Sequence, residues 1–308
     1  MTHSIRLLFI LPILALKLLA DPILSSWFTE YSGQYARIYK TAEDESALNP
    51  VTTWSHPNNG SGQSLPTYAG VHEIAYTDTN VYIRTSGLGF HIMGPWYLNE
   101  ARTNLFPNYP GNTSAIFRFP RAPGEPPISK TVTGNGTIGY FVDGIGMFDS
   151  RDAFSYSNSN AGDARPNGNF TGDGFWNRDA YINESVTFDP ANAHQAGINH
   201  HYHANPPALR HLIGGSVDYN ASTNTYTENF NGQHSPIIGW VRDGYPIYGP
   251  YGYDDPDDAT STVRRMISGY TTRNGSNGTT NLNNTNRTSL PNWAAVVKGI
   301  NASLTATQ

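Results

Sequence analysis

IGYFVDGIGMF, at residues 138–148, returns one hundred residues later as IGWVRDGYPIY, at residues 238–248. Each stretch has an aromatic-rich segment, an Asp-Gly pair and a second apolar segment. Asp-Gly between apolar arms is a strong hairpin signal, because a type I′ turn needs positive φ at both central residues. The repeat predicts two β-hairpins, which we interpret as duplicated units packed around a pseudo-twofold axis. Chance similarity between two ordinary hairpins is the alternative.

The composition around this repeat is typical of β structure. The 308 residues include 30 glycines, 21 prolines and 19 tyrosines, with 14% charged residues and no cysteine. Turn formers and aromatic residues at this density favour strands over helix bundles. A further hairpin is predicted from VHEIAY at 71–76 and VYIRTS at 81–86, which flank a polar turn. We therefore predict a mainly β chain with a single large domain and short helices at its N- and C-terminal ends.

The N-terminal residues indicate targeting. Residues 1–20 carry Arg6, an apolar run from Leu7 to Leu16 and the small Ala20, which together predict a signal peptide. An uncleaved anchor is the alternative. We expect a secreted protein, extracellular or periplasmic, with no transmembrane span after signal cleavage. The net charge of −5 provides no basic surface for nucleic acid.

The rest of the chain divides by composition. Residues 21–69 form an N-terminal segment, in which the apolar spacing of ILSSWFTEYSGQYARIY at 23–39 predicts a helix. Residues 70–270 contain both hairpin motifs and form the main β domain. Residues 271–308 are an Asn- and Thr-rich flexible stretch and a tail with a short helix.

Histidines gather beside the second hairpin. Six of the ten lie between residues 194 and 234, and NHHYH occupies 199–203. On a strand, a period of two places His201 and His203 on one face, with His200 and Tyr202 on the other. A His-x-His pair is a recurrent ligand pair for copper, zinc or iron.

Further ligands must come from elsewhere in the chain. His194 and His234 are the candidates, with His91 more distant. Structural histidines that stack on tyrosines, and acid–base chemistry without a metal, are the alternatives.

Asp243 is the candidate carboxylate near this cluster. Asp243 could orient a metal-binding histidine, coordinate the metal directly, or serve only as a turn residue. Its repeat partner Asp143 favours the turn. Tyr202, which lies between His201 and His203 in the sequence, is a second candidate for such a supporting role. Position 134, the counterpart of His234, is glycine, so the histidines belong to one copy of the repeat. This distribution fits a site grafted onto a duplicated scaffold.

NHHYHANPPAL at 199–209 and HSPIIGWVRDGYPIYGPYGY at 234–253 resemble the YHYH-domain family, as does FVDG at 141–144 followed by RDAFSYSN at 151–158. The resemblance covers roughly residues 70–275. It implies secretion, a shared β-rich fold and a site at the motif, but no particular reaction. The two family histidines correspond to His201 and His203, whereas the first tyrosine of the motif is His200 here.

Three functions remain open at this point, and enzymatic activity is undecided. The leading hypothesis is an extracellular metal-binding protein, either redox-active or hydrolytic, in which the metal lowers the pKa of bound water. The second is a non-catalytic module for an extracellular polymer or carbohydrate, with Trp96, Trp176 and Trp240 stacking on sugar rings. The third, a metal-free hydrolase, requires a nucleophile within hydrogen-bond reach of a cluster histidine. The extracellular ligand itself is unknown.

Overall fold

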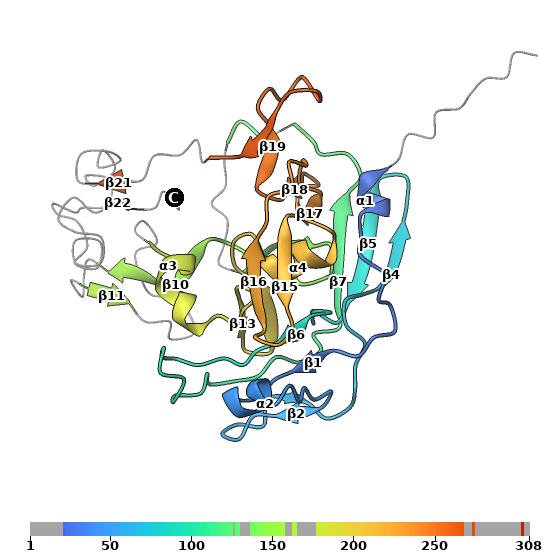
Figure 1. Ribbon diagram of the computed structural model, residues 1–308. Coiled ribbons are helices and arrows are strands. Elements are labelled where there is room, and N and C mark those ends of the chain that lie inside the picture. Colours follow the sequence, from blue (N-terminus) through green and yellow to red (C-terminus); the bar gives the residue numbers. More distant parts are fainter. Residues whose placement is uncertain are drawn as a thin grey trace, which may run out of the picture.

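The computed structural model describes residues 21–125, 127–129, 136–157, 162–164, 177–267, 273–274 and 303–304 (Figure 1). Strand accounts for 33% of the chain and helix for 10%, which confirms the mainly β prediction. The predicted signal peptide and the predicted C-terminal helix lie outside the described residues. Within the described part of the chain, none of the helices is long and apolar enough to cross a membrane.

A six-stranded sheet forms the centre of the molecule, in the order β13-β14-β9-β8-β17-β18. Its strands are β8 (Thr137–Phe141), β9 (Gly146–Phe148), β13 (Ala193–Ala196), β14 (Asn199–Tyr202), β17 (Ile237–Val241) and β18 (Pro246–Tyr248). Neighbouring strands are antiparallel except for β9 and β14, which are parallel. The two predicted hairpins, β8–β9 and β17–β18, therefore lie side by side in one sheet.

The contacts between the two hairpins are reciprocal. Val142 N donates to Ile238 O at 2.9 Å in one direction. Arg242 N donates to Ile138 O at 2.8 Å in the other direction. The two donors are one hundred residues apart in the sequence, and so are the two acceptors. Equivalent positions therefore exchange equivalent bonds, as an isologous interface requires. This arrangement is the one expected for a pseudo-twofold relation, while duplication itself stays a prediction.

The type I′ turn predicted for these hairpins is wrong. Gly144 N donates to Phe141 O at 2.9 Å, so Val142 and Asp143 are the central residues of the turn. Only the glycine that follows has positive φ, at 84°, and Gly244 repeats this at 89°. Phe141 N also donates to Ile145 O. The extra residue gives a three-residue loop with a glycine bulge, so the aspartate does not have to adopt a left-handed conformation.

The helix predicted over residues 23–39 is also wrong, apart from its first turn, α1 (Pro22–Ser25). Gly33 has φ of 89° and sits in a turn. The aromatic residues that suggested a helical face instead cover the core as the chain winds across it. Trp27, for example, packs on Phe119 with ring centroids 5.5 Å apart. Tertiary packing thus produced an apolar spacing that resembles helical periodicity.

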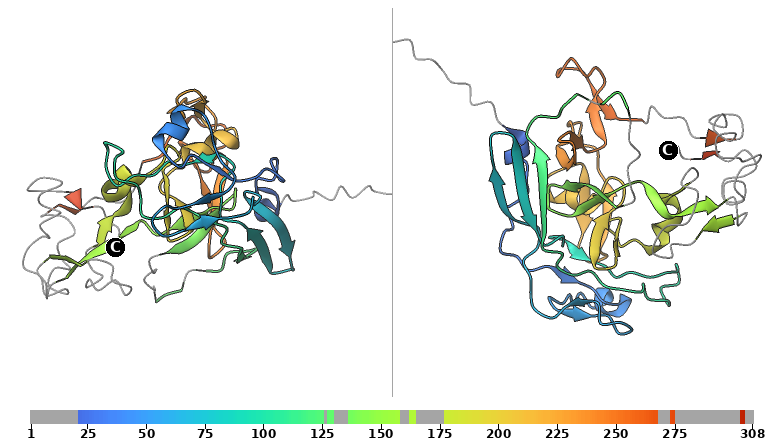
Figure 2. Two further views of the ribbon diagram at one scale, coloured as in Figure 1. Left: turned by 90° about the horizontal axis from the view of Figure 1, so that it is seen from below. Right: turned by 180° about the vertical axis from the view of Figure 1, so that it is seen from behind.

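A three-stranded sheet, β4-β5-β7, lies beside the central one and confirms the predicted hairpin at 71–86. It consists of β4 (Val71–Tyr76), β5 (Asn80–Thr85) and β7 (Ala115–Pro120). Figure 2 shows β10 (Arg151–Ser157) and β11 (Gly162–Ala164) on the opposite side of the central sheet from β4 and β5.

Short elements complete the described chain. The strands are β1 (Arg37–Ile38), β2 (Trp54–Ser55), β3 (Gly62–Gln63), β6 (Ile92–Met93), β12 (Asn177–Asp179), β15 (Val217–Asn220), β16 (Thr225–Glu228), β19 (Tyr251–Tyr253), β20 (Val263–Arg265), β21 (Arg273–Asn274) and β22 (Ser303–Leu304). The helices are α2 (Ala42–Ser46), α3 (Ala180–Glu184) and α4 (Pro207–Leu212), with a 3-10 turn at Ser185–Thr187. The loops between β6, β13 and β14 position the candidate site.

Candidate metal centre

The strand pair β13–β14 brings three of the predicted histidines together. His194 on β13 pairs directly with His201 on β14, and His203 follows the end of β14. All three side chains are buried, and one candidate ligand atom from each lies within 4.8 Å of the others. We call His194, His201 and His203 the first histidine group. It is one of two groups in the described residues that could hold a metal ion.

Hydrogen bonds orient two of these rings. Thr187 donates its hydroxyl proton to Glu184 O at 2.6 Å, so its oxygen accepts from His194 Nδ1 at 2.7 Å. His201 Nδ1 lies 3.1 Å from Asn199 O, which can only accept. Each Nδ1 therefore carries the proton, and each Nε2 presents a lone pair. A hydrogen bond from the remaining ring nitrogen is the usual support of a metal-binding histidine.

The remaining polar atoms of the group converge. His194 Nε2 and His203 Nε2 are 3.2 Å apart. Glu184 Oε2 lies 3.4 Å from the first of these nitrogens and 3.8 Å from the second. Three imidazoles bordered by a carboxylate form a donor set that suits copper, zinc or iron.

Aromatic rings enclose the group and keep it neutral. Phe148 stacks on His201 with centroids 3.8 Å apart, and Phe188 stacks on His203 at 4.3 Å. Burial lowers the pKa of His201 to about 4 and that of His203 to about 3. It holds the pKa of His194 well below the usual value as well. Neutral imidazole is the form that binds metals, so the group needs no deprotonation at neutral pH.

The structure does not bring His234 or Asp243 into this group. The ring of His234 packs 4.7 Å from Tyr253, and its Nδ1 contacts Ser235 O at 2.7 Å. Asp243 is exposed in the turn between β17 and β18. Both belong to the end of the central sheet opposite β13, and for that reason neither approaches the first histidine group.

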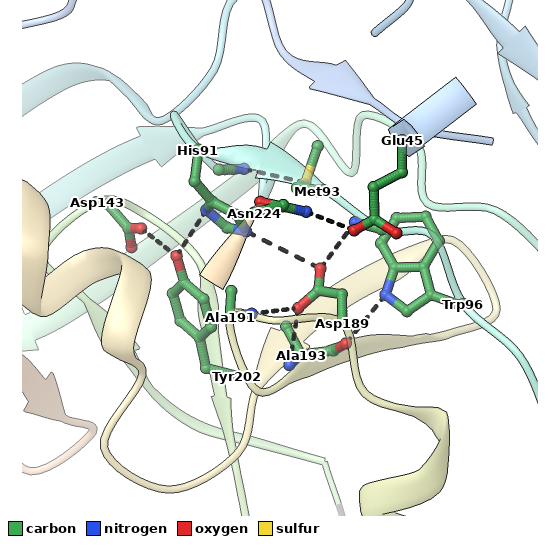
Figure 3. Close-up of polar contacts among 12 residues, drawn as sticks. Glu45, His91, Met93, Trp96, Asp143, Asp189, Ala191, Ala193, Tyr202 and Asn224 are labelled. Carbon is green, nitrogen blue, oxygen red and sulfur yellow. Dashed lines mark hydrogen bonds and ion pairs between the residues drawn. The ribbon is translucent and has the colours of Figure 1, made fainter. Parts of the chain in front are cut away.

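Tyr202 instead points to the other face of β14, as the strand alternation predicted. Its hydroxyl donates to Asp143 Oδ2 at 2.8 Å and lies 3.2 Å from His91 Nδ1 (Figure 3). His91 Nε2 is 4.0 Å from Asp189 Oδ2. Burial raises the pKa of Asp143 to about 6. A buried polar chain thus runs from the first hairpin to Asp189.

His91, Asp189 and His200 form the second histidine group, whose candidate ligand atoms also lie within 4.8 Å of one another. All three side chains are buried. Sequence reasoning placed His200 on this face and named His91 only as a distant candidate, and it missed Asp189. The three residues come from separate loops and strands, so spacing along the chain carried no signal of their meeting.

The described residues lend no support to the two other hypotheses. Trp96 and Trp240 are buried, and Trp96 Nε1 donates to Ala193 O, so neither offers a stacking platform; Trp176 lies outside the described residues. Thr187 is the hydroxyl within reach of His194, but its proton goes to a backbone carbonyl. This orientation does not fit removal of the hydroxyl proton by the histidine.

Comparison with known proteins identifies the family of the chain. The family model described as YHYH protein matches residues 116–300, which is more than half of the 308-residue chain. The match includes both hairpins of the central sheet and β14. Searches of curated proteins and of solved structures found no match.

Proposed function

The chain belongs to the YHYH protein family, and we propose that this member is a secreted protein that binds a transition-metal ion at its first histidine group. The convergence of three buried, neutral imidazoles carries the proposal. Packing alone explains one or two buried histidines, whereas here two Nε2 atoms lie only 3.2 Å apart beside a third buried ring, an arrangement that a shared cation would stabilise. The apolar N-terminal segment at residues 1–20 supports the secretion part of the proposal.

His194, His201 and His203 would supply the ligands. Thr187 and Asn199 hold the rings of His194 and His201 through Nδ1, which leaves the Nε2 atom of each ring as the lone pair. Copper, zinc and iron all accept imidazole ligands, and a bound ion would supply Lewis-acid or redox chemistry. The walls of Phe148 and Phe188 exclude water from one side, which strengthens polar interactions inside the site.

Metal content tests this assignment. We would purify the secreted chain without a His-tag and measure bound metals by inductively coupled plasma mass spectrometry. The wild type should carry copper, zinc or iron, and His201→Ala/His203→Ala should lose the ion bound at this group. His234→Ala is the matched control, since His234 lies outside both groups, and it should keep the metal.

Circular dichroism must show that the double variant remains folded. If a folded double variant keeps the full metal content of the wild type, the first histidine group is not the site. The same conclusion follows if the wild type binds no ion after reconstitution with each metal in turn. Secretion is tested separately by N-terminal sequencing of protein from the extracellular or periplasmic fraction, which should start at Asp21.

A further inference from the structure

His200 has an unusual environment for a buried histidine. Its side chain is fully buried, and within the described residues neither ring nitrogen has a hydrogen-bond partner. The backbone of His194 lies near enough to raise the pKa of His200. The contact falls short of a hydrogen bond, so both ring nitrogens stay without a partner from the described residues. A neutral imidazole has one donor and one acceptor, and each left unmet inside a protein costs about 1–3 kcal/mol. The ring therefore requires a partner other than the protein.

His91 has an unmet nitrogen that faces the same space. Tyr202 has one hydroxyl proton, and it goes to Asp143, so the tyrosine oxygen accepts from His91 Nδ1. His91 Nε2 is then a lone pair, and among the described residues it has no hydrogen-bond partner. Figure 3 shows this nitrogen directed at Asp189, whose Oδ2 is 4.0 Å away.

Asp189 supplies a buried acidic group, and no charged side chain of the described residues forms an ion pair with it while His91 is neutral. Its carboxyl accepts hydrogen bonds from the backbone N–H groups of Gly94, Ala191 and Ala193. Burial nevertheless raises its pKa to about 7. Burial also lowers the pKa of His91 to about 3, so the adjacent imidazole is neutral. A cation next to Asp189 would stabilise the carboxylate and accept the lone pairs of both histidines.

We propose that His91, Asp189 and His200 form a second metal site, distinct from the first histidine group, for a divalent first-row transition metal. Two imidazoles and one carboxylate are the donor set of mononuclear non-haem Fe(II) sites, which makes Fe(II) the first candidate and Zn²⁺ the second. Because successive side chains of β14 alternate, His200 and His201 serve different sites on opposite faces of one strand.

Pockets border two residues of this site. One of about 540 Å³ has His91 in its wall, together with Arg37 and Phe90. Another of about 570 Å³ has Asp189 in its wall. An ion needs an entry path into a folded chain.

Ion stoichiometry of the full chain tests the proposal. Metal-free protein would be titrated with Fe(II) under anaerobic conditions and, separately, with Zn²⁺, and bound ions per chain would be counted after gel filtration. We expect two ions in the wild type and one in His200→Leu, which keeps a side chain of similar bulk. Asp189→Asn is the second variant, since its amide oxygen can still accept backbone hydrogen bonds. His72→Ala, at an exposed histidine, is the control and should bind two ions.

The outcomes separate this site from the first one. If folded His200→Leu and Asp189→Asn both bind as many ions as the wild type, the second site is refuted, and buried water is the partner of His200. If the wild type and His201→Ala/His203→Ala each bind one ion while His200→Leu binds none, the second site stands and the proposed function fails. One ion in the wild type that is lost only in His201→Ala/His203→Ala would leave the first site alone.

Discussion

The two histidine groups lie on opposite faces of β13 and β14 and differ in how their ring nitrogens are satisfied. In the first group, Thr187 and Asn199 hold the Nδ1 protons of His194 and His201. In the second, both nitrogens of His200 lack a hydrogen-bond partner in the described part of the chain. The first group can therefore remain ordered without an ion, whereas the second has an energetic reason to hold one.

The two histidine groups also differ in the hydrogen-bond partners that orient their rings. Neutral partners, a threonine hydroxyl and a backbone carbonyl, support the first. A buried carboxyl supports the second, because Asp143 fixes Tyr202 and Tyr202 fixes His91. A change in the ionisation of Asp143 should therefore reach the second group and leave the first unaffected.

Metal removal should give the largest effect. A ligand present at about 1,000 times its dissociation constant stabilises the folded state by roughly 4 kcal/mol per site. Chelation should therefore cost the wild type about twice as much unfolding free energy as it costs His200→Leu or His201→Ala/His203→Ala. Urea denaturation with and without a chelator measures this difference. Equal losses in all three proteins would mean that the groups do not bind ions independently.

The pH dependence of stability should show the next largest effect. The pKa of Asp143 rises from an ordinary 3.8 to about 6 on burial, so the unfolded chain releases this proton more easily than the folded one. Relative to Asp143→Asn, the contribution of the Asp143 carboxyl to the stability of the wild type is fully present below pH 4 and is lost as the pH rises through 6. The full change is on the order of 3 kcal/mol.

Urea midpoints of metal-free protein between pH 4 and 7 measure this change. Asp243→Asn is the matched control, because Asp243 occupies the equivalent turn in an exposed position. Its midpoint should follow that of the wild type at every pH. Parallel curves for the wild type and Asp143→Asn would show that Asp143 titrates as an ordinary carboxyl.

Local sequence predicted the elements whose signals are local. The Asp-Gly hairpins at 138–148 and 238–248 form, and the His-x-His spacing correctly placed His201 and His203 together, in one group. The helix over 23–39 failed because its aromatic spacing reflects packing against the core. The I′ turn failed because an extra residue enters the loop and leaves only the glycine with positive φ.

The sites were predictable only in part for the same reason. His194 joins the first group through a hairpin partner seven residues away, and that pairing is a local event. Asp189 and His91 reach the second group through tertiary folding of segments almost one hundred residues apart. The placement of His234 near the first histidine group rested on sequence proximity, but β17 and β13 lie apart in the sheet order.

Removing one orienting hydrogen bond should weaken one site only. Loss of such a partner typically lowers metal affinity by about 10- to 100-fold. Thr187→Val should do so at the first group, and Tyr202→Phe should do so at the second through His91. Competitive titration with a chromophoric chelator measures both affinities in each variant. A loss at both sites in either variant would indicate a general distortion of β13 and β14.

The smallest effect should appear in metal-free protein, where the two neighbouring histidines of β14 should respond in opposite directions to leucine. His201→Leu loses the hydrogen bond to Asn199 O and the stacking on Phe148, which together are worth about 1 kcal/mol. His200→Leu removes two polar atoms that have no hydrogen-bond partner among the described residues, so stability should stay equal or rise by a similar amount. Thermal unfolding of both variants beside the wild type compares them directly. A clear loss for His200→Leu would show that ordered water satisfies this ring without an ion, and the difference between the two faces of β14 would then be one of hydration.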